Sequence, residues 1–174
     1  MKPPLVLLIL FVLPLFAAAQ SAQRDLKTLL QDAAYVFNRF EETTAGRDAE
    51  IDNWSVPASS KMLFKRELSG VAKNVSSEKP RLNALLGKND VSSTDLFDVY
   101  SEVIAVASEL FGQSSNYLNW GNDPAKGIEL AQLGSKAEML GADISVILRM
   151  KIKAQEAQLA TCSNKPPPPA SRQK

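Results

Sequence analysis

The sequence contains no histidine and only one cysteine among its 174 residues. Histidine is the commonest general base, the commonest zinc ligand and the usual protein ligand of haem iron, so most sites of these kinds are excluded. The single cysteine, Cys162, excludes an intrachain disulfide. The alternation of apolar and polar residues that is typical of β-strands is also missing, which favours a helical protein. Because the usual catalytic and metal-binding side chains are few, we do not expect an enzyme.

Two short patterns could still suggest catalysis or metal binding. Ser76 and Lys79 have the spacing of a Ser–Lys dyad, but Pro80 follows immediately, where the helix should continue. The alternating acids of residues 48–52 are like those of a calcium loop, but Asn53 and Ser59 replace its glycine and its closing glutamate. We therefore expect no catalytic residues, no metal and no cofactor.

The N-terminal segment has the pattern of a signal peptide, residues 1–19. Lys2 is followed by an apolar run from Leu5 to Phe16 and by three alanines that end at Ala19. Twelve residues rise only about 18 Å as a helix, which is too short for a bilayer core of about 30 Å. We expect cleavage near Ala19, no stable membrane anchor, and an exported protein that is periplasmic or extracellular.

Removal of this leader would take Lys2 with it and leave 19 basic and 19 acidic residues, since the whole chain has 20 and 19. A chain without net charge has no global electrostatic attraction for nucleic acid. Residues 20–161 are enough for one domain with its own core. Residues 162–174 contain the prolines 166–169 and are expected to form a flexible, disordered Pro-rich tail.

The longest helical pattern runs from Asn122 to Thr161. An Asx residue followed by Pro124 is a typical helix start. Beyond it lies a heptad seam of the coiled-coil type: Leu130, Leu133, Ala137, Leu140, Ile144 and Ile147. Gly127, Gly134 and Gly141 lie beside this seam, seven residues apart. Interior glycine costs a helix about 1 kcal/mol relative to alanine, so this line predicts close approach of a neighbouring helix.

Three further helices are expected before it. The first covers Ser21 to Thr44, the second begins near Pro57 and is kinked or broken at Pro80, and the third is capped by Ser92 or Ser93 and runs towards Tyr117. Asp95, Asp98, Glu102 and Glu109 share one face of the third helix, and the second is mainly basic, so the two should pair. The fold class predicted is an all-α, antiparallel up-down-up-down four-helix bundle with a long C-terminal helix.

In such a bundle, the first and third connections lie at the same end. They carry both tryptophans together with tyrosine and asparagine side chains, so we take as candidate binding residues Asn53, Trp54, Tyr117, Asn119 and Trp120. Indoles flanked by amides suit a protein partner or a sugar ring. The alternative is that the tryptophans only close the end of the core.

These patterns predict a binding or structural module whose partner is an unknown protein. The alternative is a bundle that binds a small apolar molecule or a sugar near Trp54 and Trp120. Cys162, which follows the long helix, could form an intermolecular disulfide and so a homodimer, or it could have no role.

Overall fold

The computed structural model describes residues 25–121 and 123–163, and within them every regular element is a helix. The elements are α2 (Leu26–Thr44), α3 (Arg47–Asp52), α4 (Ala58–Leu86), α5 (Ser93–Asn116), the π-helical turn η1 (Tyr117–Gly121) and α6 (Pro124–Ser163). The all-α fold class is therefore confirmed. The predicted signal peptide and residues 164–174 of the predicted tail lie outside the described residues.

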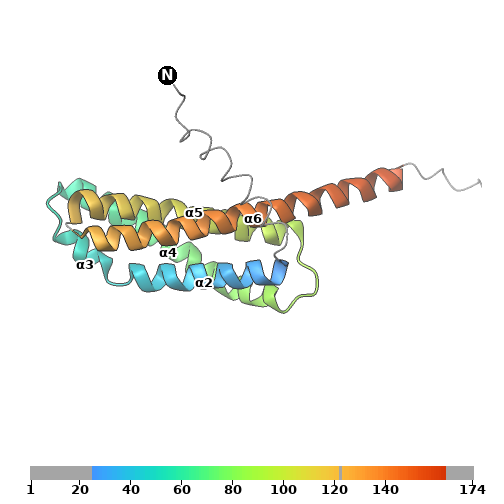
Figure 1. Cartoon of the computed structure of the whole chain (residues 1–174), viewed down its shortest axis with the longest axis horizontal. Helices are drawn as coiled ribbons and strands as arrows, with labels where there is room; N and C mark the ends of the chain where they lie inside the picture. The colour runs from blue at the N-terminus through green and yellow to red at the C-terminus, as the bar shows by residue number, and fades with distance from the viewer. Residues whose placement is uncertain (1–24, 122, 164–174) are drawn as a thin grey trace, which may run out of the picture.

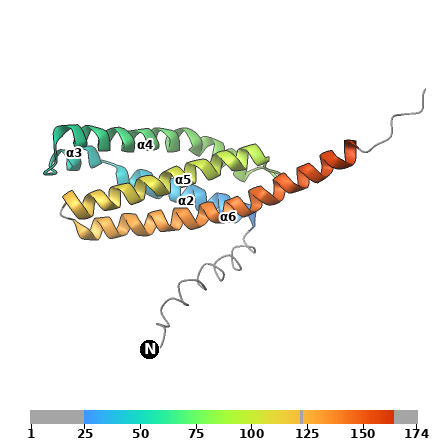
Figure 2. The ribbon, with the colours of Figure 1, turned by 90° about the horizontal axis from the view of Figure 1, so that it is seen from above.

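The four long helices lie alongside one another, and the short α3 lies at one end of them (Figure 1). α2 contacts α4 and α6, and α5 contacts the same two helices. The C-terminal part of α6 continues past the ends of its neighbours (Figure 2). Because it has no helix beside it there, residues 152–161 are all exposed.

The helix starts follow from local capping. Asp25 accepts a hydrogen bond from the Thr28 N–H at 2.8 Å and caps α2, which begins at Leu26. The predicted helix start at Ser21 lies outside the described residues. Ser92 Oγ accepts one from the Asp95 N–H at 3.0 Å, which confirms Ser92 as the cap of α5. Asp123 caps α6 in the same way, with 3.0 Å to the Lys126 N–H.

Pro80 lies inside α4, and the helix continues unbroken through it to Leu86. Of the predicted kink or break at Pro80, the break does not occur. Proline removes one hydrogen bond and clashes with the carbonyl four residues earlier, at a cost of about 3 kcal/mol. Buried side chains on both sides of it, Val75 before and Leu82 and Leu85 after, anchor both halves of α4 in the core and offset that cost.

The core consists of the seams that the sequence predicts. Leu29, Phe37 and Phe40 of α2 are fully buried, as are Leu130 and Ile144 of α6. α5 contributes a series of buried residues along its length, which are Leu96, Val99, Val103, Val106, Ala107, Leu110, Gln113 and Ser114. The core thus covers the length of α5 and the N-terminal two-thirds of α6.

The basic α4 and the acidic α5 lie side by side, as predicted, and are joined by ion pairs of one side chain, Arg81. Arg81 binds Asp95 at 2.9 Å and Asp98 at 2.5 Å. Hydrogen bonds from Arg81 and then from Ser92 lower the pKa of Asp95 to about 2. The interaction selects which helices pair more than it stabilises them, because exposed ion pairs contribute only about 0–1 kcal/mol.

Candidate interaction surfaces

The structure brings Trp54 and Tyr117 together at the end of the helices where α3 lies. Their rings pack edge to face with centroids 5.1 Å apart, and Trp54 also contacts Phe64 at 6.0 Å. Trp54 is 6% exposed and Tyr117 is 2% exposed. These two predicted site residues therefore close the end of the core, and neither offers a ring face to a ligand.

The other predicted site residues lie on the surface of the same end. Trp120 is half exposed, and Asn53 and Asn119 are exposed. Each amide is held locally, since Asn53 Nδ2 donates to the Ala49 carbonyl and Asn119 Nδ2 donates to Ser115 Oγ. The predicted cluster is thus divided into a buried aromatic pair and an exposed rim around one indole.

A polar network supports the buried pair from the side of α6. The Tyr117 hydroxyl donates to Glu50, and Lys126 Nζ lies 2.6 and 2.7 Å from the two carboxylate oxygens of Glu50. Burial and then the hydrogen bond to Glu50 raise the pKa of Tyr117. Burial also raises the pKa of Glu50, but the hydrogen bonds from Lys126 and Tyr117 outweigh this effect, so the pKa of Glu50 is lowered overall. The network joins α3, η1 and α6.

Arg47 is the charged residue that sequence reasoning missed. It is 1% exposed, its guanidinium lies 5.0 Å from the centroid of the Tyr117 ring, and its Nε donates to the Thr43 carbonyl. Burial lowers the pKa of Arg47. Its position beside Gly46, which has a φ of 76°, gave no sequence signal, because a charged residue after a turn is usually exposed.

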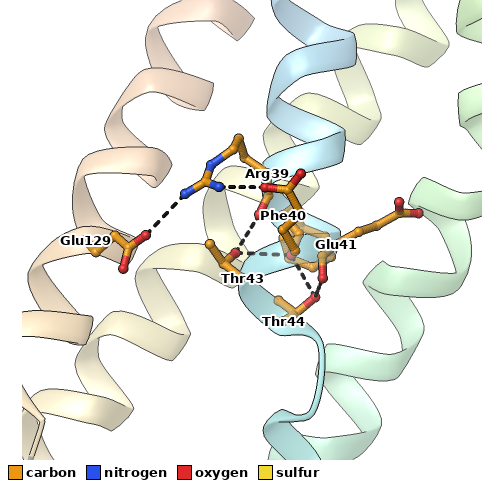
Figure 3. A network of polar contacts seen from close by, with 7 residues as sticks. Arg39, Phe40, Glu41, Thr43, Thr44 and Glu129 are labelled. Carbon is orange, nitrogen blue, oxygen red and sulfur yellow. Dashed lines mark hydrogen bonds and ion pairs between the residues drawn. The ribbon is translucent and has the colours of Figure 1, made fainter.

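The C-terminus of α2 next to Arg47 is held by its own hydroxyls (Figure 3). Thr43 Oγ1 donates to the Arg39 and Phe40 carbonyls, and Thr44 Oγ1 donates to those of Phe40 and Glu41. In the same view Arg39 reaches across to Glu129 of α6, at 3.3 Å. These side-chain hydrogen bonds add to the backbone hydrogen bonds of the helix end, where the Glu41 carbonyl also accepts from the Ala45 N–H at 3.0 Å.

Three pockets on the surface of the described residues have no tryptophan in their lining. One of about 380 Å³ lies between α2 and α6 and includes Asp32, Lys136 and Met139. A second of about 270 Å³ lies beside Arg39, Arg47 and Lys126, and a third of about 230 Å³ beside Asp90 and Lys151. All are open to solvent and lined partly by charged groups, unlike the apolar cavities that enclose small ligands.

The glycine line of α6 faces α5, as predicted. A Cβ placed on Gly127 would lie 2.9 Å from Leu118, one on Gly134 3.3 Å from the Phe111 ring, and one on Gly141 2.5 Å from Ile104. Leu118, Phe111 and Ile104 are themselves seven residues apart, and they descend as the glycines ascend. The two helices therefore run in opposite directions along this contact.

Ile104 and Phe111 of α5 and Leu118 of η1, which contact the glycines, are only partly covered by them. Leu118 is 53% exposed, Phe111 is 39% exposed and Ile104 is half-buried, and Phe97, one heptad earlier, is 53% exposed. A second line on this face consists of hydroxyl residues, also seven apart and mostly exposed: Thr94, Ser101, Ser108 and Ser115. We call these two lines together the outer seam.

Sequence reasoning assigned only the inner face of α5 and missed the outer seam. The signal was present in the chain, because Phe97, Ile104, Phe111 and Leu118 repeat every seven residues beside the core seam. A helix with two apolar stripes at different angles is typical of one that contacts partners on two sides. From the sequence alone, this heptad repeat is equally consistent with a wider stripe of core residues. Only the exposed fractions of the side chains in the structure distinguish the two interpretations.

Other classes of site find no support in the described residues. No group of three or more acidic or cysteine side chains there is arranged to hold a metal ion, and no helix there is long and apolar enough to cross a membrane. Comparison with known protein families, with characterised proteins and with solved structures finds no match for this chain.

Proposed function

We propose that this chain is an exported, non-enzymatic binding module that docks a helix along the outer seam of α5. The single observation that carries the proposal is the exposure of Phe97 and Phe111 on α5 and of Leu118 on the adjoining η1, at multiples of seven residues. Apolar side chains repeated in this way are the recognition pattern of helix-to-helix contacts. Large contiguous apolar patches on protein surfaces commonly mark interaction sites.

The scaffold proposed for this face is an antiparallel up-down-up-down four-helix bundle, with a bend of α4 at Pro80. The contacts of α2 and α5 with both α4 and α6 support it, as does the opposite direction of α5 and α6. Short connections between successive long helices also favour antiparallel neighbours. Export rests on the predicted signal peptide at residues 1–19.

A comparison of variants tests this function. The chain is immobilised and exposed to the exported fraction of its own cell, with Phe111→Ser as the test and Met62→Ser, an apolar residue of α4 that is 69% exposed, as the matched control. A chain bound by wild type and by Met62→Ser, but lost from Phe111→Ser, supports docking at the outer seam. Identical binding by all three would contradict it.

A second candidate is a small sugar or apolar ligand at the Trp54/Trp120 end. The exposed indole of Trp120 favours it, since sugars stack on open aromatic faces. Binding there would quench indole fluorescence, and the response would disappear in Trp120→Phe. A sugar response that survives in Trp120→Phe would remove Trp120 from the site.

A further inference from the structure

We propose that the outer seam pairs with the outer seam of a second copy of this chain, running antiparallel. This inference rests on the proposed function, because it names the helix that the seam docks. Three features of the outer seam support antiparallel pairing: the order of its side chains, its dimensions and its charge.

The seam alternates small and large side chains along its whole length. In chain order it reads Thr94, Phe97, Ser101, Ile104, Ser108, Phe111, Ser115 and Leu118. The steps between neighbours alternate between three and four and begin and end with three, so the series has the same spacing in both directions. A copy turned end to end therefore presents the same spacing of positions.

Antiparallel pairing places a small residue opposite each large one. Leu118 lies opposite Thr94 of the copy, Phe97 opposite Ser115, Phe111 opposite Ser101 and Ile104 opposite Ser108, given the spacing of the series. Each large side chain then fills the space over a hydroxyl residue, as a knob fills a hole. Parallel pairing would instead place Phe97 on Phe97 and leave serine opposite serine, with gaps between layers. The pattern is thus complementary to itself in one direction only, as a two-fold interface requires.

The face has about the area that a dimer needs. The seam is about 36 Å long at 1.5 Å per residue, and α5 with the adjoining side of α6 makes a strip two helices wide, about 20 Å. That gives about 700 Å² per copy, against about 800 Å² per partner in a standard specific interface. On α6 the residues beside the glycine line include Ala131, Ser145 and the exposed Ile152, so this side of the strip is mostly uncharged.

No residue of the outer seam is charged. The acids that directly follow seam residues on α5 are Asp95, Asp98, Glu102 and Glu109, and Arg81 binds the first two of them. On α6, Glu138 is exposed beside the glycine line and would lie close to its own copy near the two-fold axis. Like charges that meet at an interface oppose binding. Glu138→Gln should therefore tighten the dimer, and added salt should do the same for wild type.

Sedimentation under reducing conditions, which exclude a link through Cys162, measures the dimer. We expect wild type and Met62→Ser to form it with the same dissociation constant, and Phe111→Ser and Leu118→Ser to weaken it at least tenfold. Leu118 is included because it is 53% exposed and tolerates truncation without loss of the core, if Phe111→Ser fails to fold.

Cross-linking tests the direction of pairing. With Cys162→Ser as background, a single cysteine is placed at Ser108 or at Thr94 and treated with a short bis-maleimide. In the antiparallel dimer the two copies of residue 108 are offset by about 6 Å along the helix and those of residue 94 by about 36 Å, at 1.5 Å per residue. Ser108→Cys should therefore cross-link and Thr94→Cys should not. Linkage of both would establish parallel pairing and overturn the inference.

The outcomes separate this inference from the function on which it rests. If the wild type is monomeric but binds another protein that Phe111→Ser no longer binds, then pairing with a second copy is wrong and helix docking at the outer seam still holds. A wild type that is monomeric and binds nothing through Phe111 overturns both. A dimer that Phe111→Ser and Leu118→Ser leave unchanged places the contact elsewhere and also overturns the inference.

Discussion

The indole of Trp54 packs edge to face on the ring of Tyr117, and this contact joins the turn after α3 to the turn η1 between α5 and α6. Two connections that are 63 residues apart in the chain, from Trp54 to Tyr117, thereby close the same end of the core. The contact also divides the two tryptophans by role, because Trp54 is buried beneath it and Trp120 remains at the surface.

Trp54→Ala should lower the free energy of unfolding by about 3–5 kcal/mol, since it leaves a cavity beside Phe64 and Tyr117. Trp120→Ala should change it by no more than about 0.5 kcal/mol, as is usual for exposed positions. Urea denaturation of the two variants gives both values. Equal losses would mean that Trp120 also belongs to the core, and would remove it as a candidate contact residue.

Gly134→Leu should destabilise the fold by about 1–3 kcal/mol through overpacking, because a Cβ there already lies 3.3 Å from the Phe111 ring. Gly112→Leu is the matched control, since nothing lies within 4 Å of a Cβ at Gly112. There the better helix propensity of leucine should leave stability unchanged or raised. A Gly134→Leu protein that melts at or above wild type would show that close approach of α5 does not require the glycine.

The low pKa of Asp95, about 2, predicts a loss of stability in acid. The unfolded carboxyl has a pKa of about 3.9, so the contribution of Asp95 is complete above about pH 4 and decreases as the pH falls towards 2. Asp95→Asn should therefore be less stable than wild type at pH 7, and the two should converge near pH 2. Denaturation midpoints measured across this range would test it. A gap that stays constant would assign the effect of Asp95 to capping rather than to charge.

Glu102 should have the opposite effect. One of its carboxylate oxygens is buried without a hydrogen-bond partner, and burial, then Glu78 and Asp98, raise its pKa. A raised pKa means that the folded state binds the proton more tightly, so the ionised group costs stability as the pH rises above that of an ordinary glutamate. Glu102→Gln should be more stable than wild type at pH 7 and equal to it near pH 3. A less stable variant at pH 7 would indicate a favourable contact of the carboxylate.

Cys162 belongs to α6, but its side chain lies outside the described part of the chain. We predict that it forms an intermolecular disulfide in the exported protein. A non-reducing gel of protein taken from its own compartment should then show a dimer band that Cys162→Ser removes. A monomer with a freely titratable thiol would leave the residue without this role.

The sequence alone predicted the all-helical class, a cap at Ser92 or Ser93, an Asx cap before Pro124 and the inner seam of α6, because capping and heptad spacing act within a few residues of the chain. It also placed the glycine line against a neighbouring helix, because interior glycine costs a helix stability that close packing can offset. The expectation that the first and third connections lie at the same end of the bundle followed from the loops after the second and third helices, which are too short to cross it.

Only the tertiary structure decided which aromatic residues are covered. Trp54 and Trp120 look alike in the sequence, but the packing of Phe64 and Tyr117 buries one and leaves the other at the surface. Pro80 lies within α4 because buried residues on both sides of it offset the free-energy cost of proline in a helix. From the sequence, that cost predicted a kink or a break. Arg47 is likewise buried against Tyr117, which is distant in the chain. The exposure of the outer seam depends on how closely α5 packs against the glycines of α6.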